Sequence, residues 1–235
     1  MDSESLNESA KATQEMAKTT RKGLEVSERI GGFIAQHIGG TLEQGIGLFE
    51  DKLKYYRATN QLKYIERFNE LANKLGASAR MKPVPLKLAL PLMEAASLED
   101  DNYLQKLWVN LLFNASNEQS KINLQRSHIA ILEQLTSLEA RSLEVIYSVE
   151  TTELKENAVV THNLPKKVEV ARERDINHGE IRPEDPDDDI KLSLANLARL
   201  RLIALPMTFG GGELFYYVNH TLLGRRFVAA CTVTL

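Results

Sequence analysis

The sequence predicts a mostly α-helical protein, with a multi-helix body and a small C-terminal α+β, winged-helix-like unit. Apolar residues recur at spacings of three and four through most of residues 47–149, as in amphipathic helices. Gly76 and Pro83 stand where one helix should end and another should begin. Near the C-terminus, two apolar segments flank the glycines at 210–212, a pattern typical of a β-hairpin.

Composition indicates a globular chain that needs no disulfides or metal ions to stabilise its fold. With 235 residues, 43% hydrophobic content and a net charge of -3, the chain can bury a core as one large or two modest domains. The single cysteine, Cys231, cannot form an intramolecular disulfide, and no zinc pattern surrounds it. The polar start and the lack of a long apolar run lead us to expect a cytoplasmic protein, with only peripheral contact to the inner membrane allowed.

Changes in composition divide the chain into three parts. We expect a polar tail at residues 1–20, a helical domain with a Gly-rich amphipathic helix at 21–130, and a winged-helix-like domain at 131–235. The last domain should contain an acidic surface loop at 165–189.

Each expected helix has its own start or stop signal. Apolar spacing predicts a long helix over 47–75, ending at Gly76, and the prolines predict a short helix to about Ala96 with Pro91 inside it. Ser97 is the expected N-cap of a core helix with an apolar stripe, and Ser137 the expected N-cap of a later one. The stripe is Leu104, Leu107, Trp108, Leu111 and Leu112, and the remaining helices are expected at 128–135, 138–149, 190–202 and 221–231.

Small residues form one face of the segment between Leu24 and Gln44. Helical spacing places them together, and such a face lets another helix approach closely, in a membrane or in a soluble bundle. Charged and polar residues interrupt any bilayer span, which favours soluble packing over membrane insertion. The predicted membrane or helix-packing face consists of Ser27, Gly31, Gly32, Ala35, Gly39 and Gly40.

A second candidate is the basic segment from Lys52 to Lys82, which carries eight basic residues against two acidic ones. Such an excess can bind nucleic acid or anionic lipid, although it is more often a solvated helix face, and no nucleic-acid motif accompanies it. Nucleic acid is therefore the least favoured partner. The candidate anion-binding residues are Lys52, Lys54, Arg57, Lys63 and Arg67.

Nothing in the sequence predicts an enzyme, a metal site, a cofactor or a small-molecule substrate. The five histidines are scattered, and no metalloprotease, nucleophile-elbow or phosphate-loop motif is present. The acidic run ending at Asp189 lacks the glycine and glutamate of a calcium loop, so we expect a solvated loop that ends in a helix N-cap. The helix at 190–202 is too leucine-rich for a base-reading helix, which favours contact with a protein.

Four segments together resemble the Abi-alpha (abortive infection alpha) family of bacteria: GGTLEQGIGLFEDKLKYYR, KPVPLKLALPLMEAASLEDDNYLQKLWVNLLFNAS, SHIAILEQLTSLEARSLEVI and NLARLRLIAL with NHTLLGRRFVAAC. The most specific part is EAASLEDDNYLQKLWVNLL at 94–112. The resemblance implies a role in phage resistance and carries over no catalytic residue, and the acidic stretch around 165–189 departs from the pattern. The matching positions are Gly39, Gly40, Glu43, Gly45, Pro83, Pro85, Glu94, Ser97, Glu99, Asp100, Trp108 and Asn110.

Three hypotheses for function remain open at this stage. The first is an antiphage protein whose Gly-rich helix perturbs the inner membrane when triggered. The second is a cytoplasmic adaptor or immunity-type protein that binds a partner protein through its C-terminal unit. The third, weaker one is nucleic-acid binding by the basic segment. A protein partner or self-association is expected in the first two.

Overall fold

The computed structural model describes residues 25, 28–29, 32–33, 36, 38–39, 54–76, 80–149, 158–170 and 183–233. The chain forms two compact units, one of residues 1–100 with 116–121, the other of residues 101–115 with 122–235. These positions differ from the boundary expected at 130 and 131. Within the described residues there are seven helices and a four-stranded antiparallel sheet, so the predicted class, mostly α with a C-terminal α+β unit, is confirmed.

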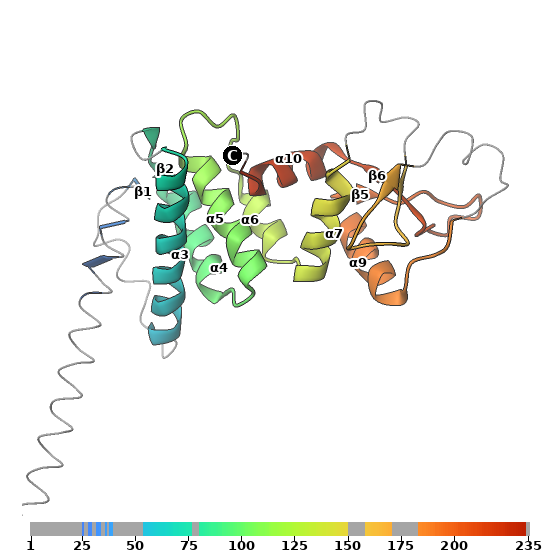
Figure 1. Ribbon diagram of the computed structural model, residues 1–235, viewed down its shortest axis with the longest axis horizontal. Coiled ribbons are helices and arrows are strands. Elements are labelled where there is room, and N and C mark those ends of the chain that lie inside the picture. Colours follow the sequence, from blue (N-terminus) through green and yellow to red (C-terminus); the bar gives the residue numbers. More distant parts are fainter. Residues whose placement is uncertain are drawn as a thin grey trace, which may run out of the picture. The chain divides into compact units, whose positions relative to one another are not determined.

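The first unit is built around two helices, labelled in Figure 1. Helix α3 covers Lys54–Lys74 and α4 covers Leu86–Leu98, with the two-residue strand β2, Val84–Pro85, directly before α4. A second short strand, β1 at Ile38–Gly39, pairs with β2 in parallel. The predicted Gly-rich helix therefore does not extend through Ile38 and Gly39, because their backbone is in a strand.

Helices α3 and α4 lie side by side because each presents an apolar stripe to the other (Figure 1). The buried apolar side chains of α3 lie one, three and four residues apart, so they share one face of the helix. The Asn60 side-chain amide donates to the Ser97 carbonyl oxygen at 3.2 Å, whereas the buried Nε2 of the neighbouring Gln61 has no hydrogen-bond partner among the described residues. The buried apolar residues are Tyr64, Ile65, Phe68 and Ala72 of α3 and Ala89, Leu92, Met93 and Ala96 of α4.

Glycine and proline set the ends of these helices as predicted. Gly76 has a φ of 59° and its backbone N–H donates to the Asn73 carbonyl oxygen, so a residue without Cβ ends α3. Pro85 is the N-cap position of α4 and Pro91 lies inside the helix. Ser97, however, lies within α4, and its hydroxyl donates to the Glu94 carbonyl oxygen, so it does not cap the following helix.

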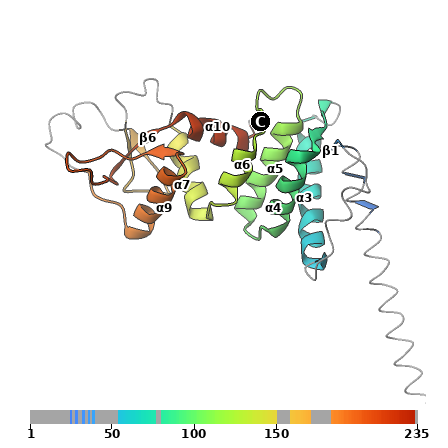
Figure 2. The same ribbon diagram turned by 180° about the vertical axis from the view of Figure 1, so that it is seen from behind.

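The second unit contains five helices and the sheet. The sheet has the strand order β4-β3-β6-β5, and all neighbouring strands are antiparallel. Figure 2 shows α9 and α7 side by side, next to this sheet. In chain order, the elements are α5 Asn102–Ser116, α6 Arg126–Leu132, α7 Ser137–Tyr147, β3 Val159–Val160, β4 Glu169–Val170, α9 Asp188–Arg199, β5 Ile203–Ala204, β6 Tyr217–His220 and α10 Leu222–Cys231.

The predicted hairpin is present, since β5 pairs with β6 and a bridge joins Met207 and Glu213 beyond them. Two strands that the sequence did not predict, β3 and β4, widen it into a sheet. The sequence does not reveal these strands because each has only two residues, too few to show an alternating pattern. The predicted order of helix, helix, hairpin and closing helix holds for α7, α9, β5–β6 and α10.

Two helix caps differ from the expected ones by one or a few residues. Asp101 caps α5, because its Oδ1 accepts from the backbone N–H groups of Tyr103 and Leu104 at 2.8 and 3.0 Å. Thr136, not Ser137, caps α7: its hydroxyl accepts from the Glu139 N–H, and the Glu139 carboxylate accepts from the Thr136 N–H. This reciprocal arrangement is the capping box, whose spacing TSLE is visible in the sequence.

The last helix is held at its C-terminal end by α5. The buried amide of Asn110 donates to the Cys231 carbonyl oxygen at 2.9 Å. The Asn114 amide donates to the carbonyl oxygens of Ala230 and Thr232 at 2.8 and 2.9 Å. The last carbonyl groups of a helix have no partner within it, so these two asparagines supply what α10 itself lacks.

The N-terminal end of α10 is held by the Tyr147 hydroxyl. That group donates to the Leu202 carbonyl oxygen at 2.7 Å and accepts from the Thr221 N–H at 2.9 Å. Thr221 is the N-cap of α10, with its side chain accepting from the Gly224 N–H. A Cβ at Gly224 would overlap both the Leu202 carbonyl oxygen and the Tyr147 hydroxyl, so only glycine fits there.

We expect Gly224→Ala to lower the free energy of unfolding by about 3 kcal/mol or more, because overpacking here meets a backbone carbonyl and a hydrogen-bonded hydroxyl that cannot move apart. Urea denaturation of the purified protein measures the change. The matched control is Gly210→Ala, where the nearest atom to a new Cβ is the Thr208 hydroxyl at 4.0 Å. An equal loss of stability in both variants would contradict this account.

Candidate binding surfaces

The predicted small-residue face is only partly within the described residues. Ser27, Gly31, Ala35 and Gly40 lie outside them, so their grouping stays a prediction. Gly32 is exposed, and among the described atoms none lies within 4 Å of a Cβ built on it. Gly39 belongs to β1 and pairs with Pro85, so it does not share one continuous helical face with the others.

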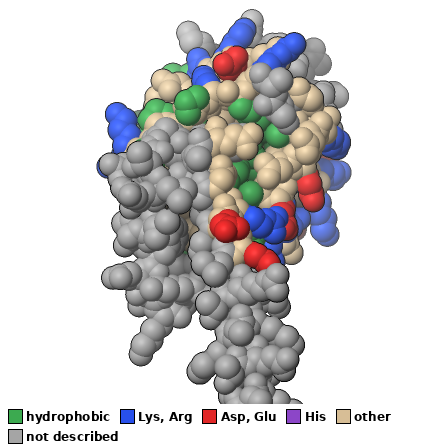
Figure 3. All heavy atoms as spheres, turned by 90° about the vertical axis from the view of Figure 1, so that its left-hand side faces the viewer, with side chains coloured by type: hydrophobic (Ala, Val, Ile, Leu, Met, Phe, Trp, Pro, Cys, Tyr) green, Lys and Arg blue, Asp and Glu red, His purple; other side chains and the backbone are tan. Residues whose placement is uncertain are grey.

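The candidate anion-binding residues are spread along α3. Lys52 lies outside the described residues, and the side chains of Lys54 and Arg57 are not described. Lys63 is exposed and Arg67 is half-buried, with acidic side chains exposed on the same helix at Glu66 and Glu70. The coloured side chains in Figure 3 include both signs of charge. Anion binding here stays a prediction.

Within the second unit, several polar side chains in the interior form hydrogen bonds that stabilise the fold. The His220 ring stacks on Tyr147 with centroids 4.2 Å apart, and its Nε2–H donates to the Ile146 carbonyl oxygen at 2.8 Å. The Asn196 amide joins α9 to α7 by donating to the Glu139 carboxylate at 2.6 Å. Each of these groups satisfies a backbone atom, a cap or a neighbouring helix.

The thiol of Cys231 and the hydroxyl of Tyr103 in this unit both have raised pKa values, which disfavour their deprotonated forms. Burial raises the pKa of the Cys231 thiol, which disfavours the thiolate that a nucleophile needs. Burial and the hydrogen bond to Glu144 raise the pKa of the Tyr103 hydroxyl. The Arg141 guanidinium lies 4.5 Å from the centre of the Tyr103 ring, a cation–π contact that ties α7 to α5.

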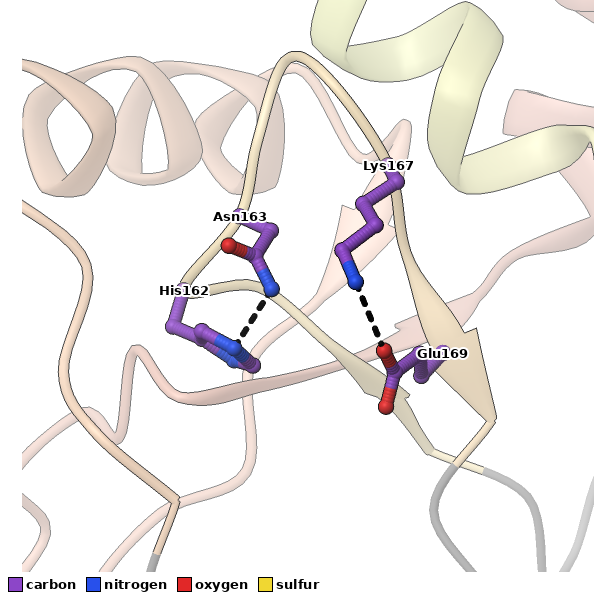
Figure 4. A network of polar contacts seen from close by, with 4 residues as sticks. All are labelled: His162, Asn163, Lys167 and Glu169. Carbon is purple, nitrogen blue, oxygen red and sulfur yellow. Dashed lines mark hydrogen bonds and ion pairs between the residues drawn. The ribbon is translucent and has the colours of Figure 1, made fainter.

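The acidic stretch and the histidines form no metal centre among the described residues. Asp187 is the N-cap of α9 and accepts from the Ile190 N–H at 2.9 Å, which confirms the expected end of the loop. In the loop between β3 and β4, the His162 ring pairs with the Asn163 amide, while Lys167 pairs with Glu169 at 3.2 Å (Figure 4). These two exposed pairs do not converge on one point in Figure 4.

Apolar side chains on the surface of the second unit are the feature that the sequence analysis missed. Phe209, at the tip of the β5–β6 hairpin, is fully exposed, and Met207 before it is 65% exposed. Leu192 on α9 and Leu222 on α10 are 72% and 74% exposed. A phenylalanine placed directly before three glycines signals a turn position, where the side chain has no neighbouring strand to cover it.

The hairpin tip is closed by backbone hydrogen bonds, so Phe209 projects from an ordered turn. The Thr208 N–H donates to the Gly212 carbonyl oxygen at 2.7 Å, and the Gly211 N–H donates to the Thr208 carbonyl oxygen at 2.9 Å. Gly211 has a φ of 86°, which explains a glycine at this position. We name Met207 and Phe209 the hairpin tip pair.

Among the described residues, these features define a helical protein with a small sheet and with exposed apolar side chains on its C-terminal unit. A profile of the family described as abortive infection alpha matches residues 57–231. The chain therefore belongs to the abortive infection alpha family, as its sequence motifs indicated. No curated protein and no solved structure gives a significant match.

The match has a consequence for the predicted sites. It covers parts of both compact units but begins after the small-residue face, so Gly39, Gly40, Glu43 and Gly45, first assigned to the family pattern, lie outside it. Arg57, Lys63 and Arg67 lie within it, as does the hairpin tip pair. Of the helices in the described ranges, none combines the length and apolar content that crossing a bilayer requires.

We expect the stability of the protein to fall as the pH drops below about 6.5, the ordinary pKa of histidine. Burial lowers the pKa of both His128 and His220, and the Arg225 charge lowers that of His220 further, against the hydrogen bond to Ile146. Below pH 6.5 these two histidines bind protons more readily in the unfolded chain than in the folded chain. The stabilisation is complete at pH values above the pKa that these histidines have in the unfolded chain. It is lost as the pH falls through their lower pKa in the folded protein.

The measurement is the denaturation midpoint at several pH values between 7.5 and 5, roughly spanning this window. His220→Gln keeps a side-chain N–H that can reach the Ile146 carbonyl oxygen and removes the titration, so its midpoint should depend less on pH. A slope identical to that of the unsubstituted chain would show that His220 does not contribute.

Proposed function

We propose that this protein acts in abortive infection as a non-enzymatic antiphage protein that binds a partner protein through its C-terminal unit. Membership of the abortive infection alpha family supports the antiphage role. The fully exposed Phe209, with Met207 beside it, is the observation that supports binding as the mode of action. The absence of a catalytic motif in the sequence is consistent with this view.

The hairpin tip pair is suited to enter a pocket on a partner. Residues 206–212 carry no charge, so the tip can be desolvated without burying an ion. A protruding aromatic side chain on a hydrogen-bonded turn loses little conformational freedom on binding, which is why aromatic residues dominate the binding energy of interfaces. The glycines that follow Phe209 have no side chains, so they add little bulk beside the phenylalanine ring.

Leucines of α9 divide sharply between the core and the surface. Leu194 and Leu197 are fully buried, so a charge at either would unfold the unit before it tested binding. Leu192 is exposed and can be substituted without that cost. The surface of α9 should therefore be tested at Leu192.

We expect the double variant Met207→Ser, Phe209→Ser to lose antiphage protection, with phage plaquing raised at least about tenfold over cells with the unsubstituted protein. Its melting temperature should stay unchanged, since neither side chain is in the core. The control is Leu98→Ser, which removes an apolar side chain 48% exposed in the other compact unit. Full protection by the double variant would overturn this proposal.

A second candidate is perturbation of the inner membrane by the Gly-rich segment. Gly32 supports it, because a helical glycine is costly by about 1 kcal/mol relative to alanine and no described neighbour requires one there. A small, uncovered surface of this kind suits close approach by another helix or by lipid.

We expect Gly32→Leu to abolish depolarisation of infected cells if this second candidate is the mode of action, because leucine blocks close approach. Membrane potential and fractionation of infected cells are the measurements. Gln36→Ala, a change at an exposed position of the same segment that adds no bulk, is the control. An intact potential in cells with the unsubstituted protein, under conditions where it restricts phage, would remove the candidate.

A further inference from the structure

The described residues that precede α3 are attached to the first unit at three points. The Phe33 side chain is 4% exposed and meets the Phe68 ring edge-on, with centroids 5.2 Å apart. The Arg29 guanidinium pairs with the Glu66 carboxylate at 2.9 Å. Strand β1 adds to β2 in parallel, with Ile38 opposite Val84. We call Arg29, Phe33 and β1 the plug.

The plug has the form of a bound peptide. Its one buried side chain among those described is Phe33, while Glu25, Glu28 and Gln36 are exposed. Phe33 lies in helical backbone and Ile38–Gly39 in a strand, so the plug combines two recurring modes of peptide recognition: a helical anchor side chain in an apolar site, and a strand added to the edge of another.

The receiving surface belongs to the part of the chain that the family shares, and the plug does not. Phe68, Glu66 and β2 all lie within residues 57–231, whereas the plug precedes the match. The Arg29–Glu66 pair has both side chains about half exposed, so solvent screens it and it adds little to the hold. Among the described residues, the attachment is therefore carried mainly by the Phe33 ring and by β1, which pairs with β2 and also contacts α4.

We propose that α3 and β2 form a peptide-binding site which the plug occupies in cis, and that the site takes a segment with an aromatic residue in helical backbone followed by a short strand. Release of the plug exposes Phe68 and the free edge of β2 to such a segment. This site lies in the first unit and goes beyond the proposed function, which concerns the C-terminal unit.

The test uses the full chain with Phe33→Ser and a labelled synthetic peptide of residues 24–41. The peptide should bind the Phe33→Ser protein at least about tenfold more tightly than the unsubstituted protein, in which the plug competes for the site. The same peptide with Phe33→Ser should not bind. Equal affinity for both proteins, or none for either, would overturn the proposal.

Hydrogen exchange provides a second, independent measurement. In the Phe33→Ser protein the amides of Ile38 and Gly39 should exchange at least about tenfold faster, while those of α4 stay protected. Gln36→Ser, an exposed position in the same stretch, is the matched control and should leave β1 protected. Unchanged exchange at β1 in the Phe33→Ser protein would show that the ring does not hold the plug.

The oligomeric state separates attachment in cis from exchange between two copies. If the plug acts in cis, both proteins run as the same species in solution. A dimer that Phe33→Ser dissociates would place the plug on a second copy and overturn the arrangement in cis. None of these measurements uses phage, so they stand or fall separately from the proposed function.

Discussion

The C-terminal unit depends on the point where the Tyr147 hydroxyl meets the start of α10. One oxygen atom serves both the Leu202 carbonyl oxygen and the Thr221 N–H, and so ties α7 to the end of α9 and to the last helix. The approach is close enough that Gly224 has no room for a side chain. Because a buried donor or acceptor left without its partner costs more than the bond itself gains, the elements at this point are fixed together. The ordered hairpin that carries Phe209 extends from the same place.

The two compact units divide the functional possibilities between them. The C-terminal unit offers exposed apolar groups on an ordered scaffold, whereas the first unit offers an apolar site that the chain itself already fills. Family membership connects both units to abortive infection without choosing between them. The two proposals accordingly assign different roles to the two units.

Much of the fold could be predicted because the apolar periodicity of the helices agrees with the glycine and proline residues at their ends. The ends of α3 and α4 follow from Gly76, Pro85 and the helical spacing between them. The misses have physical causes: two-residue strands show no alternation, and a cap depends on which of two adjacent hydroxyls reaches the third N–H, as with Thr136 and Ser137. The strand at Ile38 was masked by an apolar spacing that also suits a helix. The exposure of Phe209 had a local signal in the three glycines that follow it, but these glycines entered the prediction only as evidence for a hairpin.

The two asparagines of α5 have a consequence for synthesis of the protein on the ribosome. The carbonyl groups that Asn114 holds lie 115 to 118 residues later in the chain, in the last turn of α10. Contacts of such sequence separation form late, because the loop between them must first be closed. While the ribosome is still making the hairpin, α5 has no α10 to hold. The packing of α10 against α5 is thus completed only after synthesis has passed Thr232.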